Sequence, residues 1–177
     1  MTLRDIVSLA EKIKKDNGTG DPAEICRNLG YHLLYQSLGS HETAIKGFVI
    51  TVGGEMAITV NSDLPENIQK IIIAHELFHA LEHCGMSLCG YSEWAMFNEL
   101  SDMEKEANLF AAELLLEDAD VAGALEYNGD FFAAAAALYV PAELFEYKLR
   151  LMRSKGFKIE EAPVIPHNNF IKDIKVG

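Results

Sequence analysis

The sequence is poor in cysteine and in long apolar runs, and these shortages limit where the protein works. Its 177 residues include three cysteines, Cys26, Cys84 and Cys89, which cannot all pair within one chain. Reduced thiols fit a cytoplasmic location. The sustained apolar run at residues 71–74 is far too short to span a membrane, and the N-terminus lacks the apolar region of a signal peptide. We therefore expect a cytoplasmic protein.

Basic residues are also scarce. Lys and Arg number 15 against 27 Asp and Glu, which gives a net charge of −12 at pH 7. Because phosphate backbones repel an acidic chain, we do not expect nucleic acid as a general partner. Acidic residues are concentrated between positions 93 and 120, where Lys105 is the only Lys or Arg: Glu93, Glu99, Asp102, Glu104, Glu106, Glu113, Glu117, Asp118 and Asp120. They form either a rim that attracts a basic protein substrate or an ordinary solvated face.

The most informative pattern is H-E-x-x-H, formed by His75, Glu76 and His79 within residues 66–83, a segment without Gly or Pro. Apolar residues recur in this segment at helical spacing. On a helix, His75 and His79 lie on one face, so both imidazoles can bind one zinc ion. Glu76 can then reach a water held by the metal. The pattern predicts the water-activating half of a metallopeptidase; the alternative is two ordinary helical histidines.

A zinc site of this kind needs a third protein ligand, with the fourth position left for water. His83 continues the four-residue series but lies about 12 Å from His75 along a helix axis. One ion with bonds of about 2.0–2.1 Å cannot be shared across that span. The metzincin pattern requires glycine and histidine where this chain has Glu82 and Gly85. That subclass is excluded.

Two glutamates on a later predicted helix, residues 101–116, are the remaining candidates. Ser101 followed by Glu104 has the form of a capping box at the start of this helix. Glu104 shares a helix face with Asn108, whereas Glu106 lies on another face. An amide beside the ligand carboxylate can orient a histidine ligand. We favour Glu104 as the third ligand with Asn108 supporting it, and Glu106 stays the alternative.

The rest of the chain predicts an α+β fold. At 49% hydrophobic, the chain can form one domain with a buried core. Helices are expected at residues 1–15, 22–29, 118–127, 131–139 and 141–152, and strands at 31–36, 48–52 and 56–60. Gly53-Gly54 turns the last two strands into a hairpin within a small antiparallel sheet beside the H-E-x-x-H helix. We divide the chain into a metallopeptidase core (1–118), a helical subdomain packed on it (119–159) and an extended tail (160–177).

Two segments point to a known family. One is A-H-E-L-F-H-A-L at residues 74–81, and the other is E-K-E-A-N-L-F-A at residues 104–111, followed by Leu114 and Leu115. Together with the hairpin and the segment around Val140-Pro141, they resemble the ImmA/IrrE family of bacterial zinc metallopeptidases over residues 25–151. The second segment is the more discriminating, because H-E-x-x-H occurs in many unrelated peptidases.

The resemblance implies a zincin-like fold that binds one Zn²⁺ per chain. It implies His75, His79 and Glu104 as metal ligands and Glu76 as the catalytic base. Phe78 stands where the family often has Gly, which predicts crowding behind the site. Relatives typically cut a helix-turn-helix repressor of a mobile element or stress operon. A DNA-binding repressor is thus the expected substrate, with no direct contact to nucleic acid or membrane.

Two other function classes stay open. The chain could be a metal-stabilised module that sequesters a repressor without cleaving it. It could also bind DNA through its last helices, since residues 130–158 carry five basic and three acidic side chains. Residues 83–100, which include Tyr91 and Trp94, are expected to cover the site. The donor for the reaction's oxyanion is undecided among Tyr127, Tyr139, His41 and His167.

Overall fold

The computed structural model describes residues 1–41, 44–83, 97–160, 162–163 and 171, with the side chains of 97–101 left out. The described helices are α1 (Leu3–Asn17), α2 (Pro22–Asn28), α3 (Glu66–Glu82), α4 (Phe97–Leu115), α5 (Asp118–Asn128), α6 (Phe131–Ala137) and α7 (Ala142–Ser154). The described strands are β1 (His32–Gln36), β2 (Gly47–Val52) and β3 (Glu55–Asn61). The α+β class and the approximate position of each element are as the sequence predicts. No helix in the described ranges is both long and apolar enough to cross a membrane.

The sheet is mixed, so the prediction of an antiparallel sheet was wrong for one strand. Strands β2 and β3 form the expected antiparallel hairpin, and both turn glycines have positive φ. Strand β1 pairs with β3 in parallel, which gives the order β1-β3-β2. Ten residues connect β1 to β2, enough for β2 to lie two strand positions away from β1. Strand β3 then fills the position between them. The buried Asn61 side chain holds the connection through hydrogen bonds to the carbonyl oxygens of Gly39 (2.9 Å) and Ile45 (3.0 Å).

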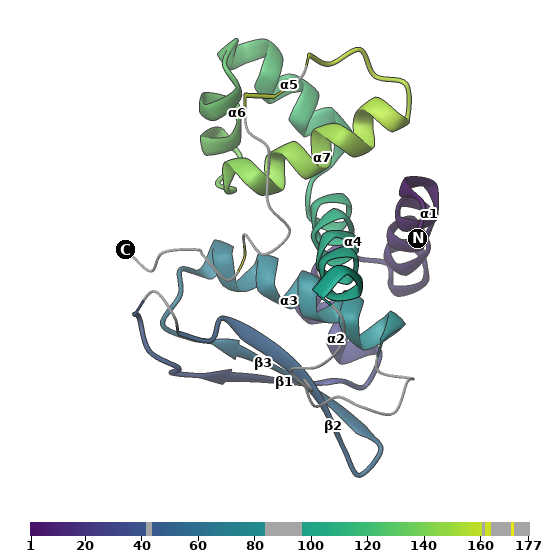
Figure 1. Ribbon diagram of the computed structural model, residues 1–177, viewed down its shortest axis with the longest axis vertical. Coiled ribbons are helices and arrows are strands. Elements are labelled where there is room, and N and C mark those ends of the chain that lie inside the picture. Colours follow the sequence, from purple (N-terminus) through teal and green to yellow (C-terminus); the bar gives the residue numbers. More distant parts are fainter. Residues whose placement is uncertain (42–43, 84–96, 161, 164–170, 172–177) are drawn as a thin grey trace.

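Helix α3 lies between the sheet and α4, as Figure 1 shows. Every residue from 71 to 80 is buried, because the helix is covered by β2 and β3 on one side and by α2 and α4 on others. Its sequence is accordingly apolar around most of its circumference, as a helix without a solvent face requires. The polar side chains His75, Glu76 and His79 are therefore held inside the molecule by the same contacts that form the core.

Helix α4 begins at Phe97, so the predicted capping box at Ser101 was wrong. Ser101 lies inside the helix, one turn after its start. The four preceding residues, F-N-E-L, contain no Gly or Pro to end the helix, and serine is tolerated within helices. Helix α4 contacts α1, α3 and α7 and so connects the metal-motif helix with the C-terminal helices.

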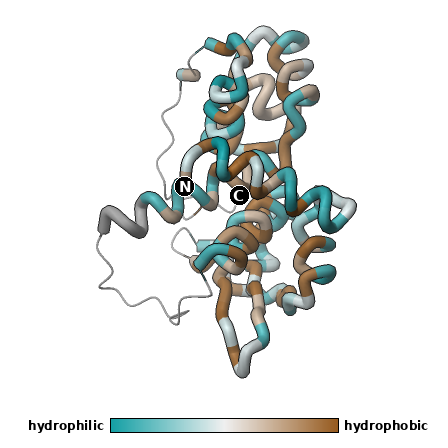
Figure 2. Tube along the Cα trace, turned by 90° about the vertical axis from the view of Figure 1, so that its right-hand side faces the viewer, coloured by the Kyte–Doolittle hydropathy of each residue, from teal (hydrophilic) through white to brown (hydrophobic). Residues whose placement is uncertain are grey.

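The described core has two hydrophobic clusters, and α7 contributes to both. The larger lies among α1–α4 and the sheet; the smaller joins α5, α6 and α7, which stand apart from the sheet in Figure 1. In Figure 2, hydrophobic and hydrophilic residues alternate along the helices, as amphipathic helices require. The division at residue 118 stays a prediction. Most of the predicted tail lies outside the described residues, although Ile171 is buried in the larger cluster.

Candidate metal centre

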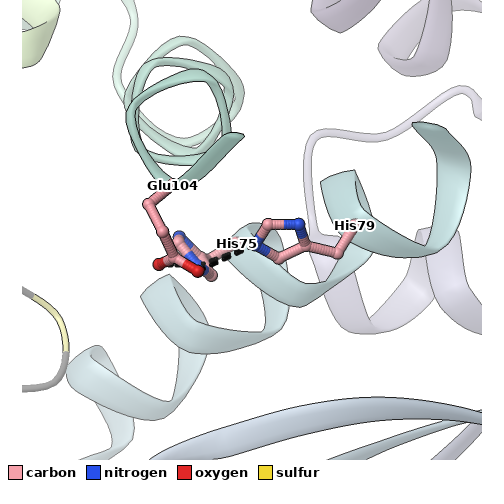
Figure 3. A group of neighbouring side chains, drawn as sticks. All are labelled: His75, His79 and Glu104. Atoms are coloured by element: carbon pink, nitrogen blue, oxygen red, sulfur yellow. Dashed lines mark hydrogen bonds and ion pairs between the residues drawn. The ribbon is translucent and has the colours of Figure 1, made fainter. Parts of the chain in front are cut away.

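Three side chains meet between α3 and α4. His75 and His79 extend from successive turns of α3, and Glu104 reaches them from α4 (Figure 3). The Nε2 atoms of the two histidines are 3.2 Å apart. The Glu104 carboxylate oxygens lie 3.4 Å from His75 Nε2 and 3.8 Å from His79 Nε2. All three residues are buried, and one ligand atom from each lies within 4.8 Å of the other two.

This donor set fits a zinc ion. Two atoms bound to one tetrahedral zinc at about 2.0–2.1 Å lie about 3.3 Å from each other. The two Nε2 atoms are 3.2 Å apart, close to that value, and each faces a different Glu104 oxygen: Oε2 lies 3.4 Å from His75 Nε2 and Oε1 lies 3.8 Å from His79 Nε2. Two imidazole nitrogens and one carboxylate oxygen also match the two-histidine, one-glutamate sets of catalytic zinc sites. These residues would hold the ion.

The second ring nitrogen of each histidine has a partner that directs Nε2 toward the centre. His75 Nδ1 lies 3.0 Å from the Oδ1 atom of Asn108, which is fully buried on α4. His79 Nδ1 lies 2.9 Å from His83 Nδ1. Partners of this kind orient metal-binding histidines and fix their tautomer. Sequence reasoning considered His83 only as a ligand and missed this contact, although the i, i+4 spacing of His79 and His83 could have indicated it.

The pKa values of His75 and His83 are shifted in opposite directions. Burial disfavours the charged form of His75, but Glu104 and Glu76, together with the Asn108 hydrogen bond, outweigh it and raise the pKa of His75. At His83, burial prevails over the nearby carboxylates and lowers the pKa of that imidazole. The carboxylates of Glu104 and Glu76 therefore favour a positive charge at His75, as they would favour a cation bound at this site.

Glu76 lies beneath the start of strand β2. Its side chain is 8% exposed, and a Cβ atom added to Gly47 would lie 3.5 Å from the Glu76 Cγ atom. The same Cβ atom would lie 2.4 Å from the Ile72 Cγ2 atom. Only glycine lets the strand approach α3 this closely. Sequence reasoning missed Gly47; a glycine immediately before the strand predicted at residues 48–52 was the available signal.

The structure separates the two candidate glutamates. Glu104 lies with the histidines, whereas Glu106 forms an ion pair with the α-amino group of Met1. The nearby acids hypothesised to form a substrate-attracting rim are largely paired as well. Glu113 and Asp118 contact Lys148 and Lys155, and Glu117 contacts Lys14. Asp102 and Asp120 are exposed, and the side chains of Glu93 and Glu99 lie outside the description.

Phe78 packs against α4 and against two of the histidines, and the crowding predicted from it stays a prediction. It is fully buried between α3 and α4, with its ring centroid 5.4 Å from that of Phe110. Its ring also makes edge-on contacts with the rings of His79 and His83, at 6.1 and 5.5 Å between centroids. A larger side chain here fills the space between the two ligand-bearing helices.

Several other predicted features remain untested. Tyr91, Trp94 and His167 lie outside the described residues, as do Cys84 and Cys89. Tyr127 and Tyr139 are 90% and 77% exposed, and His41 is exposed as well. The choice of an oxyanion donor stays open among the predicted candidates.

Comparisons with known proteins agree with this geometry. The family model described as "IrrE N-terminal-like domain" matches residues 26–150. The chain is 30% identical over 161 residues to "Metallopeptidase ImmA" of Bacillus subtilis (strain 168), covering 89% of this chain and 92% of that protein. It is also 30% identical over 146 residues to "Uncharacterized immunity region protein 2" of Bacillus phage phi105, covering 81% and 88%. The chain therefore belongs to the ImmA/IrrE family of metallopeptidases.

Proposed function

We propose that this protein is a zinc-dependent endopeptidase of zincin-like architecture that hydrolyses a peptide bond in a DNA-binding repressor. The observation that carries the proposal is the buried group of His75, His79 and Glu104, with Glu76 on the same helix. The three side chains would hold one Zn²⁺ per chain. A zinc ion bound there supplies a water of pKa about 7 and polarises the carbonyl of the scissile bond.

The remaining chemistry belongs to the chain's own residues. Glu76 acts as the general base: its carboxylate accepts the proton of the attacking water and later passes it to the leaving amine. Asn108 and His83 orient the two imidazoles from their Nδ1 sides. The burial of Glu76 keeps bulk water away from its carboxylate, which supports a role in directed proton transfer.

An edge strand beside the site supports binding of an extended peptide. Strand β2 ends the described sheet on one side, and its first residue, Gly47, lies against the helix that carries Glu76. A peptide that adds to this edge uses main-chain hydrogen bonds, as proteases commonly hold their substrates. Its backbone would then run close to the proposed base.

The repressor as substrate rests on the family and on one relative's name. The relative from Bacillus phage phi105 is named as an immunity region protein. The acidic charge of −12 suits a basic, DNA-binding protein as partner. Because many acids near the site are paired with lysines, overall charge supports this proposal more than a dedicated acidic rim does.

Metal content tests the site. We expect one zinc per wild-type chain, lost in Glu104→Ala and kept in Glu106→Ala, because only Glu104 lies with the histidines. One zinc per chain kept in both variants would exclude Glu104 as a ligand. No zinc in the wild type, even after zinc is added back, would leave a binding role as the better account.

Proton transfer is tested by Glu76→Gln on candidate helix-turn-helix repressors. The variant should keep its zinc while cleavage falls by about 10²–10⁴-fold, the usual contribution of a general base. Cleavage at the native rate would refute the role of Glu76. Repressor inactivation that persists without cleavage would instead favour sequestration.

A further inference from the structure

Helix α6 is apolar on both of its sides, although only one side is covered. The covered side packs into the smaller cluster through Phe131, Ala134, Ala135 and Leu138. The other side is exposed to solvent, and its residues are Phe132, Ala133, Ala136 and Ala137, followed directly by Tyr139. A helix that is apolar all round is normally buried. These five exposed residues therefore form an unpartnered apolar surface, which we call the α6 face.

The two aromatic side chains of the α6 face are the most exposed large residues on it. Phe132 is 51% exposed and Tyr139 is 77% exposed. Tyr139 also has a φ of 56°, in the left-handed region that glycine adopts readily and bulky residues avoid. Its ring buries too little surface within the described chain to offset that cost. An exposed aromatic ring at a strained position indicates a contact with another molecule.

The helices around the α6 face carry acidic residues and no basic ones. The chain has no Lys, Arg or His between positions 106 and 147. Asp130 caps α6, and Asp120 and Glu126 are exposed on α5, which packs beside α6. The next basic residues along the chain, Lys148 and Arg150, are paired with carboxylates. A segment that covers the α6 face should therefore combine apolar side chains with Lys or Arg.

Charge also disfavours other kinds of partner. A second copy docked face to face would bring two acidic surfaces together. Nucleic acid and anionic lipid carry the same sign of charge as α5. A basic amphipathic helix fits better, because its apolar side can cover Phe132 and Tyr139 while its basic side chains reach the acids of α5. The exposed alanines of α6 let such a helix approach closely.

The α6 face is linked to the helix that carries the metal motif. Asn67, in the first turn of α3, donates a hydrogen bond from Nδ2 to the Tyr139 carbonyl oxygen at 2.8 Å. His75 follows eight residues later, which is about 12 Å along the axis of α3. A protein bound at the α6 face is therefore within reach of the metal centre.

We propose that the α6 face is a docking surface for a basic amphipathic helix of the protein substrate, separate from the segment that is cleaved. The identity of the occupant as the substrate rests on the proposed function. Binding of a basic amphipathic helix to this face does not, so the two can be tested apart.

Peptide binding tests the surface directly. The probe is a synthetic helix of Leu and Lys with Leu along one side, compared with the same helix carrying Glu in place of Lys. The Lys helix should bind the full chain at least about 10-fold more tightly than the Glu helix. Phe132→Ser should weaken its binding by about 10-fold, a typical effect of losing an aromatic contact. Phe157→Ser is the matched control, a 42% exposed phenylalanine that should not affect binding. Equal binding of the two helices, or equal losses in the two variants, would overturn the proposal.

Tyr139→Gly separates binding from folding. Glycine suits a φ of 56°, so the urea midpoint of the variant should stay the same or rise. Its affinity for the Lys helix should nevertheless fall by about 10-fold, because the exposed ring is lost. A lower urea midpoint would show that the ring packs within the chain. That result, or an unchanged peptide affinity, would contradict the proposal.

Two charge reversals separate local from overall charge. Glu126→Lys on α5 and Glu11→Lys on α1 change the net charge of the chain by the same amount, and both side chains are exposed. Glu126→Lys should weaken binding of the Lys helix by about 3-fold at low ionic strength, and this difference should vanish in high salt. Glu11→Lys should have no such effect. Equal losses would mean that overall charge attracts the peptide, and the α6 face would then have no special role.

Cleavage of an intact helix-turn-helix repressor tests the occupant. Phe132→Ser should raise KM for the repressor by about 10-fold with little change in kcat, because the docking contact is lost and the metal centre is not. An unchanged KM would show that the substrate does not use the α6 face. If the Lys helix binds as expected and no repressor is cleaved, the proposed function fails while the docking surface stands. If the wild type instead self-associates through Phe132 and binds neither helix, a second copy is the occupant and the proposal is wrong.

Discussion

Gly47 of strand β2 lies against Ile72 of helix α3 so closely that an added Cβ atom would be 2.4 Å from the Ile72 Cγ2 atom. The same Cβ atom would lie 3.1 Å from the Thr59 carbonyl oxygen of the neighbouring strand. Gly47→Ala should therefore push β2 away from α3 and lower the free energy of unfolding by about 1–3 kcal/mol. Because Glu76 lies under the same position, cleavage should fall as well. Urea unfolding and a cleavage assay measure the two effects.

A second substitution identifies the cause. Ile72→Ala removes the Cγ2 atom that an alanine at position 47 would meet. The double variant should be less destabilised than the sum of its two single variants, because the clash and the cavity offset each other. Strict additivity would show that contact with Ile72 is not the cause of the loss in Gly47→Ala.

The local elements were predictable because their signals lie in adjacent residues. The Gly53-Gly54 turn defined the hairpin, and Asp21 caps α2 through hydrogen bonds to the backbone of Ala23 and Glu24. Helical spacing alone separated Glu104 from Glu106, since residues two apart lie on different faces.

Features that depend on distant segments were not predictable in the same way. The parallel pairing of β1 with β3 depends on a connection held by Asn61, which no local pattern reveals. The role of Gly47 depends on which strand packs against α3. Such contacts are set by the assembled core, and one sequence does not specify which helix faces meet.

His83 should strengthen metal binding without being a ligand. Its ring lies 2.9 Å from His79 Nδ1 and so orients the second imidazole. His83→Ala should weaken zinc affinity by about 10–100-fold while one zinc per chain is still bound at saturation. His32→Ala is the control, because His32 pairs with Glu55 on the exposed side of the sheet. Complete loss of zinc would instead make His83 a ligand, and an unchanged affinity would make its contact incidental.

Lys148 should contribute more to stability than exposed lysines do. Its side chain is 1% exposed, and Nζ lies 2.8 Å from a Glu113 carboxylate oxygen and 2.6 Å from one of Asp118. Lys148→Met leaves buried carboxylate charge with Lys155 as the remaining described partner. We expect a loss of about 3 kcal/mol in urea unfolding, the lower end for breaking a buried pair.

An exposed pair provides the comparison. On α1, Lys12 Nζ lies 3.0 Å from Asp16 Oδ2, and the two side chains are 70% and 53% exposed. Lys12→Met should cost no more than about 0.5 kcal/mol, because solvent screens such pairs. Equal losses at Lys12 and Lys148 would mean that the buried cluster contributes nothing beyond ordinary surface charge.

The same cluster should make stability depend on pH in the acid range. Burial opposes ionisation of Asp118, but hydrogen bonds and charge from Lys148 and Lys155 outweigh it and lower its pKa below 3.8. A carboxyl whose folded pKa is depressed stabilises the fold above its unfolded pKa, and that contribution is lost as pH falls through the folded value. Asp118→Asn should therefore be less stable than the wild type near neutral pH, and the difference should shrink below about pH 3.8.

The alkaline side gives the opposite sign for Lys155. Burial disfavours its charge, but Glu113 and Asp118 outweigh burial and raise the pKa of Lys155 above 10.5. Its stabilisation is present below 10.5 and is lost only as pH rises through the folded value. The free energy of unfolding in urea, measured from acid to alkaline pH, tests both the Asp118 and the Lys155 effects, with Asp16→Asn as the exposed control. If the difference between wild type and Asp118→Asn stayed constant from neutral to acid pH, the Asp118 carboxylate would not be stabilised by its lysines.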